Sequence, residues 1–124
     1  MVLPDTSIWI EWLIDGPAIA KLPGKFPARE RCLVPTLVQH ELMKWLLREK
    51  GEDEADEIIA YTQKCAVTVL DTPIALHAAE LCRQHKLASA DGIIYATALR
   101  HEAELWTCDA HFNGLPGVIC VAKP

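Results

Sequence analysis

Short apolar segments alternate with longer amphipathic segments along the whole chain, and no other feature constrains its fold as strongly. The expected strands are short runs of apolar or β-branched residues: 1–3, 32–34, 66–70, 105–107 and 118–121. The expected helices lie between them: 7–14, 36–50, 52–64, 73–85 and 89–101. Strands that alternate with helices predict a parallel sheet covered by helices on both faces, which is an α/β fold.

The ends of several elements carry local signals. Thr36 and Ser89 are expected to cap the helices that they begin, and Gly51 is expected to end the first of these helices. The segment 16–27, with three prolines and two glycines, is expected to be a loop. Pro4 has no N–H for a sheet ladder, so we expect it at the end of the first strand.

The length and composition predict one globular domain. A chain of 124 residues with 51% hydrophobic and 23% charged residues is long enough to bury one core, and no linker divides it, so 1–124 is expected to be a single domain. No apolar run approaches the roughly 20 residues of a membrane span, and the N-terminus does not resemble a signal peptide. The expected location is therefore the cytoplasm. The five cysteines include no CxxC pair, which favours reduced thiols over a disulfide framework or a zinc ribbon.

The net charge of −5 is unusual for a protein that binds nucleic acid, because phosphate contacts normally need a basic surface. Two arrangements would reconcile the charge with such a function. Clustered acids that bind divalent cations become locally positive once loaded, and the basic side chains could be gathered on one rim.

Three aspartates stand where an expected strand ends or an expected helix begins. Asp5 follows the first apolar run, Asp91 lies in the first turn of the helix 89–101, and Asp109 follows the strand 105–107. Taken singly, each has a plain structural reading, because a short acid near a helix start accepts backbone N–H bonds. Taken together, they fall at the carboxyl ends of parallel strands, where ligands of open α/β sheets bind.

Glu41 is the fourth acid of interest, because it interrupts an apolar helical stripe. It lies three residues after Val38 and four before Trp45. The stripe consists of apolar residues at helical spacing: Val34, Leu37, Val38, Leu42, Trp45 and Leu46. A glutamate that faces a core without a partner is costly, so Glu41 either has a cationic partner or reaches solvent at the edge of the stripe.

Four carboxylates brought together repel one another and favour a bound cation. Hard oxygen ligands select Mg²⁺ or Mn²⁺, and no cysteine or histidine cluster at zinc spacing competes with them. One or two such ions would polarise a phosphoryl oxygen and lower the pKa of an attacking water, which suits the hydrolysis of phosphate esters.

Five segments, four of which contain these acids, follow one another along the chain: DTSIWIEWL at Asp5, VPTLVQHELMKWL around Glu41, LDTPIALHAAEL at Leu70, ASADGIIYATAL at Asp91 and LWTCDAHFNGLPGV at Asp109. In this order and spacing they resemble the PIN-domain ribonucleases of the VapC toxin type. The resemblance spans nearly the whole chain. It implies a three-layer α/β/α sandwich with a parallel central sheet, and a single PIN domain over 1–124. Pro4 departs from the family pattern, in which an aliphatic strand residue is more usual.

The same resemblance implies a function and a site. The function is Mg²⁺- or Mn²⁺-dependent endonucleolytic cleavage of RNA, with Asp5, Glu41, Asp91 and Asp109 as catalytic and metal-binding residues. The partners are an RNA substrate, a cognate VapB-type antitoxin and a second copy of the chain in a homodimer. Four further residues flank the acids and are candidates for supporting roles: Thr6, Ser7, Thr107 and His111.

The supporting residues have alternative readings. In the family such hydroxyls hold a water or a carboxylate, whereas a helix-cap role fits Thr6, Ser7 and Thr107 equally well. His111 resembles the His-Phe pair that follows the last acid in the family, and either packing or phosphate contact would explain it. The four tryptophans are expected in the core or at a dimer contact rather than as platforms for bases.

Two rival functions belong to other classes. A phosphotransferase or receiver-like domain with Asp5 as the phosphorylated residue is disfavoured, because Asp5-Thr6-Ser7 lacks a second acid and no lysine follows the last strands in a suitable position. An inactive or weakly active PIN scaffold that acts through partner binding is the other rival, and the presence of all four acids speaks against it.

Overall fold

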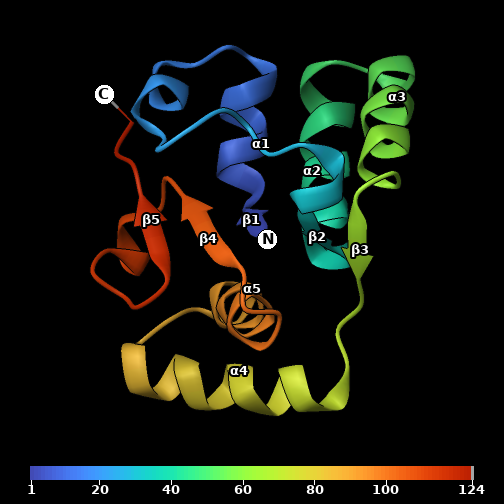
Figure 1. Cartoon of the computed structure of the whole chain (residues 1–124). Coiled ribbons are helices and arrows are strands. Elements are labelled where there is room, and N and C mark those ends of the chain that lie inside the picture. Colours follow the sequence, from blue (N-terminus) through green and yellow to red (C-terminus); the bar gives the residue numbers. More distant parts are fainter. Residues whose placement is uncertain (124) are drawn as a thin grey trace.

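The computed structural model describes residues 1–123, and in it short parallel strands alternate with helices as the sequence predicts (Figure 1). The strands are β1 (Val2–Pro4), β2 (Leu33–Pro35), β3 (Ala66–Thr68), β4 (Glu104–Thr107) and β5 (Val118–Cys120). The α-helices are α1 (Thr6–Leu13), α2 (Thr36–Glu49), α3 (Glu52–Thr62), α4 (Thr72–His85) and α5 (Ser89–Arg100). Three short 3₁₀ helices complete the elements: η1 (Pro17–Lys21), η2 (Arg29–Arg31) and η3 (Ala110–Phe112). The expected α/β sandwich with a parallel sheet is thus confirmed.

The sheet is divided where β1 meets β2. Hydrogen-bonded strands form one group in the order β1-β4-β5 and another of β2 and β3, and a single bridge between Val2 and Cys32 joins them. The backbone N–H groups along a strand point alternately to the two sides, and the N–H of Asp5 donates to Trp106 of β4. Pro4 therefore faces β2, where its missing N–H removes the next rung of the ladder. This proline limits the pairing that an unbroken five-stranded sheet would need.

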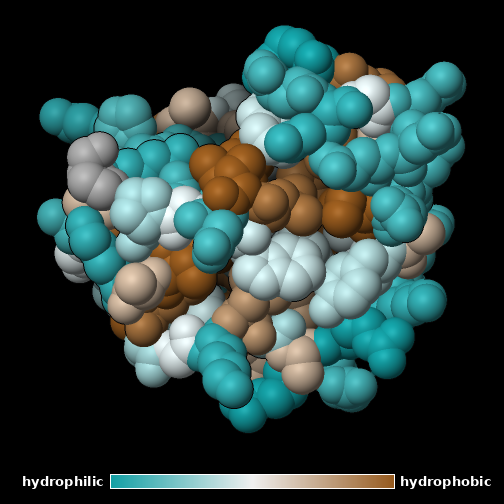
Figure 2. All heavy atoms as spheres, turned by 90° about the horizontal axis from the view of Figure 1, so that it is seen from above, coloured by the Kyte–Doolittle hydropathy of each residue, from teal (hydrophilic) through white to brown (hydrophobic). Residues whose placement is uncertain are grey.

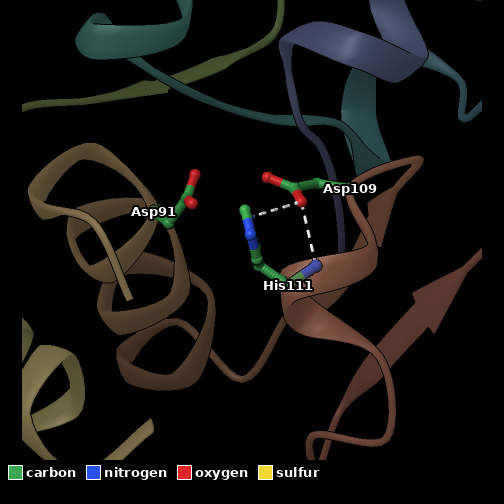
Figure 3. A group of neighbouring side chains, drawn as sticks. All are labelled: Asp91, Asp109 and His111. Atoms are coloured by element: carbon green, nitrogen blue, oxygen red, sulfur yellow. Dashed lines mark hydrogen bonds and ion pairs between the residues drawn. The ribbon is translucent and has the colours of Figure 1, made fainter. Parts of the chain in front are cut away.

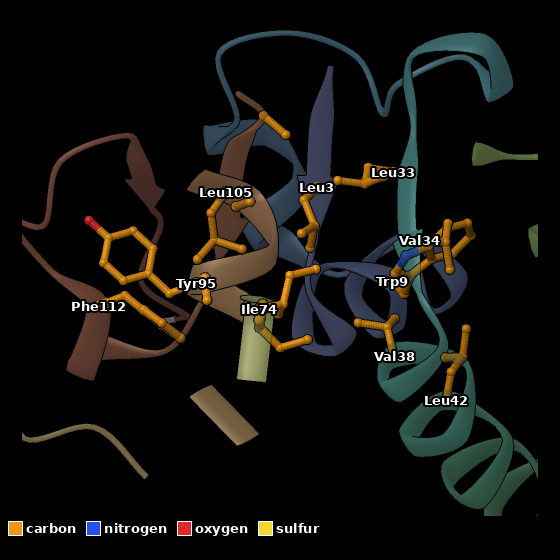
Figure 4. Packing of buried hydrophobic residues seen from close by; sticks show 14 of the residues in the cluster. Leu3, Trp9, Leu33, Val34, Val38, Leu42, Ile74, Tyr95, Leu105 and Phe112 are labelled. Atoms are coloured by element: carbon orange, nitrogen blue, oxygen red, sulfur yellow. The ribbon is translucent and has the colours of Figure 1, made fainter. Parts of the chain in front are cut away.

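Two clusters of apolar side chains lie on opposite faces of β1 and β4. Leu3 and Leu105 point into the larger cluster, together with Trp9, Tyr95 and Phe112 (Figure 4). Trp106 points to the other face and packs in a smaller cluster whose buried members are Ile8, Ala18, Leu22, Trp106 and Val121. The period-two alternation along each strand places neighbouring residues in different clusters, as expected for a sheet covered on both faces.

The tryptophans are part of the hydrophobic core and its edge. Trp9 and Trp106 are buried, whereas Trp12 and Trp45 are partly buried against the larger cluster. The ring of Trp12 stacks on Phe26 with centroids 4.4 Å apart, and Trp9 meets the same ring edge-on at 4.8 Å. Figure 2 shows that apolar and aromatic side chains gather in the middle of the face seen from above, with hydrophilic side chains around them. The sequence-based expectation of packing rather than base-stacking roles agrees with the burial of Trp9 and Trp106.

Several local predictions need correction. Thr36 and Ser89 do not cap helices: Pro35 and Ala88 occupy the cap positions, and neither makes a side-chain cap bond. The chain enters α2 directly from β2, so Thr36 is already inside the first turn. The predicted loop 16–27 contains η1. The predicted strand 66–70 ends at Thr68, because Val69 and Leu70 extend away from the sheet and are exposed.

Gly92 allows α4 and α5 to pack closely. A Cβ at this position would lie 3.0 Å from the carbonyl oxygen of Ala78 and would overlap the Sγ of Cys82. We expect Gly92→Ala to lower the free energy of unfolding by about 1–2 kcal/mol, because overpacking outweighs the gain in helix propensity. Urea unfolding measures this difference. Gly24→Ala is the control, since nothing lies within 4 Å of its Cβ position; equal midpoints for the two variants would contradict the tight contact.

Within residues 1–123, none of the helices is both long and apolar enough to span a bilayer.

Candidate metal centre

Asp5 leaves the end of β1 and is held by three donors. Its carboxylate accepts hydrogen bonds from the hydroxyls of Ser7 and Thr107, each at 2.5 Å, and from the backbone N–H of Ile8 at 3.2 Å. The residue is only 9% exposed. Burial raises the pKa of Asp5 to about 6, although the hydrogen bonds from Ser7 and Thr107 act in the opposite direction. In the protein without a cation, this carboxyl group is therefore poised to carry a proton below neutral pH.

Asp91, Asp109 and His111 form a compact group of potential ligands. One donor atom from each lies within 4.8 Å of the others, and Figure 3 shows their side chains converging from α5 and from the turn after β4. The Oδ1 atom of Asp109 accepts the backbone N–H of His111 at 2.9 Å and lies 3.1 Å from the Nδ1 of the same residue. Burial raises the pKa of Asp91, and the charge of Asp109 raises it further. Two acids and an imidazole thus share one small volume.

Thr107 connects Asp5 to this group. Its hydroxyl donates to the Oδ2 of Asp5 and accepts the backbone N–H of Asp109 at 2.9 Å. The hydroxyl of Ser7 makes a parallel link, because it donates to Asp5 and accepts the N–H of Cys108 at 3.0 Å. These two hydroxyls fix the carboxyl ends of β1 and β4 against each other. Both hydroxyls bond the Asp5 carboxylate, and the side chain that caps α1 is that of Asp5 itself.

Glu41 lies at the edge of the buried stripe of α2, not within it. Val38 and Leu42 are buried, whereas Glu41 is partly exposed and its Oε1 accepts the hydroxyl of Thr6 at 2.7 Å. Its charge contributes to the raised pKa of Asp91, so the two carboxylates lie within electrostatic reach of each other. Glu41 is therefore at the edge of the apolar stripe and not in the core. Its polar partner is Thr6, and it is near enough to Asp91 for its charge to raise the pKa of that residue.

The structure brings the predicted residues together in two ways. Asp91 and Asp109 share one group of donor atoms with His111. Asp5 and Glu41 stand outside that group, and hydroxyl side chains link Asp5 to the backbone of Asp109 and Glu41 to the start of α1. The sequence flagged His111 only as a flanking residue and missed its direct contact with Asp109. Its position two residues after an acid that ends a strand is the signal that could have found it.

The donor set fits a divalent cation. Carboxylate oxygens suit Mg²⁺ and Mn²⁺, which take ligands at about 2.0–2.2 Å, and donors on opposite sides of such an ion lie roughly 4–4.5 Å apart. The separation of up to 4.8 Å among Asp91, Asp109 and His111 is therefore only slightly wider than an ion requires. Burial, followed by the charge of Asp109, raises the pKa of Asp91, and a bound cation would relieve this cost of holding ionised carboxylates together.

A protein-family model and several solved structures are similar to this chain. The PIN domain family model matches residues 2–118 of the chain. No curated protein sequence matches it. A solved toxin–antitoxin complex from Klebsiella pneumoniae is similar over 100% of both chains, with 26% identity and a TM-score of 0.82.

Two more distant structures share the fold. FitAcB from Neisseria gonorrhoeae aligns over 90% of this chain and 89% of its own, with 20% identity and a TM-score of 0.65. VapC20 from Mycobacterium tuberculosis, described as a toxin that cleaves the sarcin–ricin loop, aligns over 94% of this chain and 95% of its own, with 16% identity and a TM-score of 0.64. The family match covers almost the full length and the matched segment includes all four acids, so the chain belongs to the PIN domain family.

Proposed function

We propose that this protein is a divalent-metal-dependent endoribonuclease and the toxin of a toxin–antitoxin pair. The observation that carries the proposal is the convergence of Asp91, Asp109 and His111 beside Asp5 and Glu41 in a PIN domain. The likeness to a toxin–antitoxin complex at 26% identity, and to the RNA-cleaving toxin VapC20 in fold, supports the choice of substrate and of system.

The acids have distinct parts in this proposal. Asp91 and Asp109 would hold one Mg²⁺ or Mn²⁺, and Asp5 and Glu41 would complete its surroundings or hold a second ion. When bound, such an ion polarises the scissile phosphate and makes water a better nucleophile. His111, whose side chain is 77% exposed, would contact the RNA phosphate or add a nitrogen ligand. A nitrogen donor would favour Mn²⁺ over Mg²⁺.

The hydroxyls beside the acids serve to position, not to attack. Ser7 and Thr107 each donate their one hydroxyl proton to the Asp5 carboxylate and accept one backbone N–H, so a single lone pair of each oxygen stays free. These bonds hold both oxygens where the ends of β1 and β4 meet, and attack on a phosphate would draw the attacking oxygen away from them. We therefore expect direct hydrolysis by water.

The proposed partners are an RNA strand, a cognate antitoxin of the VapB type and a second copy of this chain, and the proposed location is the cytoplasm. The alternative function is a PIN scaffold that is inactive or weakly active and works through its partner alone. This alternative keeps the fold and the antitoxin but needs no cation.

Purified protein should therefore cleave RNA when Mg²⁺ or Mn²⁺ is present and stop when EDTA is added, because chelation removes the charge that offsets the carboxylates. Sequencing of the cleaved ends on total RNA measures the activity and identifies its target. Cleavage that persists at the same rate in EDTA, with contaminating nuclease excluded, would exclude a metal-dependent mechanism.

Glu41→Gln tests the acid of α2. We expect it to abolish cleavage with little change in the free energy of unfolding, because the amide oxygen still accepts the hydroxyl of Thr6 while the ligand charge is lost. RNA cleavage and urea unfolding are measured on the same preparation. Glu49→Gln is the matched control, since Glu49 lies on the same helix and pairs with Arg48 at 3.0 Å in an exposed position. Wild-type cleavage by the Glu41→Gln variant would remove Glu41 from the site.

A further inference from the structure

Cys32 and Cys65 stand opposite each other at the entrance to β2 and β3. Leu33 pairs with Ala66 in this parallel ladder, so the preceding residues, Cys32 and Cys65, are also in register. The backbone N–H of Ala66 donates to the carbonyl of Cys32 at 3.0 Å, which extends the pairing to the cysteines. Residues in register on neighbouring strands project their side chains on the same face of the sheet.

This placement matches the geometry that a disulfide needs. Neighbouring strands lie about 4.8 Å apart, and the Cα atoms of disulfide-bonded cysteines lie about 4.4–6.8 Å apart. Both side chains belong to the same hydrophobic cluster. The Cys65 thiol helps to raise the pKa of Cys32 and the Cys32 thiol in turn affects Cys65, which agrees with sulfurs in close proximity.

We propose that Cys32 and Cys65 form a dithiol site that a small-molecule disulfide of the glutathione type oxidises to an intramolecular disulfide bond. The proposal does not depend on the ribonuclease function. Cys65 is the accessible member because it is only partly buried, whereas Cys32 is fully buried.

The chemistry follows from this difference in access. The Cys65 thiol loses its proton to water and attacks one sulfur of the oxidant, which releases one small thiol and leaves a mixed disulfide on Cys65. Cys32 then loses its proton and attacks the Cys65 sulfur, which releases the second small thiol. Two protein S–H groups are oxidised and one small-molecule disulfide is reduced to two thiols. Burial raises the pKa of both cysteines, so the exchange should be slow near neutral pH and faster in alkaline buffer.

The remaining cysteines have other surroundings. The Sγ of Cys82 donates to the carbonyl of Ala88 at 3.5 Å, and that of Cys120 donates to the carbonyl of Asp109 at 3.4 Å. Cys120 pairs in register with Thr107, so it does not stand opposite Cys108 across β4 and β5. The register thus singles out Cys32 and Cys65 as a facing pair.

A disulfide here would close a loop that contains α2 and α3. Closing a loop of this length restricts the unfolded chain and stabilises the folded one. The oxidised protein should therefore melt roughly 5–10 °C above the reduced protein, and dithiothreitol should reverse the shift.

The test uses the full chain and oxidised glutathione at alkaline pH. After the reaction is quenched in acid, the protein is denatured, alkylated and weighed by mass spectrometry. Reduced wild-type protein takes up five alkyl groups, one for each cysteine. The oxidised protein should take up two fewer, and peptide mapping should place the link between Cys32 and Cys65.

Two variants sharpen the result. Cys65→Ser should show no cross-link, whereas Cys82→Ser, which changes another partly buried cysteine, should keep the link and the thermal shift. The proposal fails if the wild type keeps all its free thiols, if glutathione stays attached to Cys65 without a cross-link, or if the link joins a different pair.

Discussion

Replacement of Asp91 by Asn should reduce RNA cleavage by several orders of magnitude while the fold is retained. Asn keeps the shape of the side chain but removes the charge that a divalent cation needs. Because Asp91 lies in the first turn of α5 and makes no side-chain cap bond there, its loss should cost little helix stability. The removal of repulsion from Asp109 should even favour the folded state slightly.

Asp71→Asn is the control for this experiment. Asp71 is also an aspartate at a helix start, where its Oδ1 accepts the backbone N–H of Ile74 at 2.9 Å, but it caps α4 outside the group of donor atoms. It should cleave RNA at the wild-type rate. Expressed without antitoxin, the wild type and Asp71→Asn should arrest growth and Asp91→Asn should not. An Asp91→Asn protein that still cleaves RNA and stays toxic would leave the partner-binding scaffold as the better proposal.

Replacement of Asp5 by Asn should remove a pH-dependent loss of stability in the cation-free protein. The pKa of Asp5 is about 6 in the folded protein, against 3.8 for an unperturbed aspartate. Between these two pH values the folded state therefore holds a proton that the unfolded chain has already released. The stability contributed by this group is present below the lower pKa and is lost as the pH rises through the higher one. The loss amounts to about 2 kcal/mol between roughly pH 4 and pH 8.

The Asn side chain does not titrate, so the Asp5→Asn variant should not lose this stability. As the pH rises from roughly 4 to 8, the unfolding free energy of the wild type should therefore fall by about 2 kcal/mol relative to that of the variant. Urea unfolding in EDTA at several pH values measures it. In excess Mn²⁺ the order should reverse, because a cation at a hundredfold excess over its Kd adds about 2.7 kcal/mol to the wild type and much less to the variant. A difference that is flat with pH would mean that Asp5 is already ionised in the fold.

Local sequence patterns were sufficient to predict the class of fold. The five helices lie within two residues of their expected bounds because apolar periodicity over two or more helical turns reports one buried face. The parallel direction of the strands followed from their alternation with helices. Pro4 ends the first strand as expected, and the chemistry of proline explains the break in the sheet beside it.

The candidate site was predictable only in outline. Strand ends at Asp5 and Asp109 could be recognised because parallel strands finish at the same edge. Which atoms meet there was not encoded locally: Thr107 reaches Asp5 across 102 positions of the chain, and Thr6 reaches Glu41 across 35. Such contacts depend on the register of β1 against β4 and on the packing of α1 against α2.

The sequence by itself therefore determined the order and type of the elements, the parallel sheet and the edge at which its acids collect. The tertiary structure alone decided the hydroxyl bonds around Asp5, the contact of His111 with Asp109 and the facing thiols of Cys32 and Cys65. The physical reason is that periodicity and turn chemistry act over a few neighbouring residues. Strand register and burial, in contrast, are set by the packing of segments far apart in the chain.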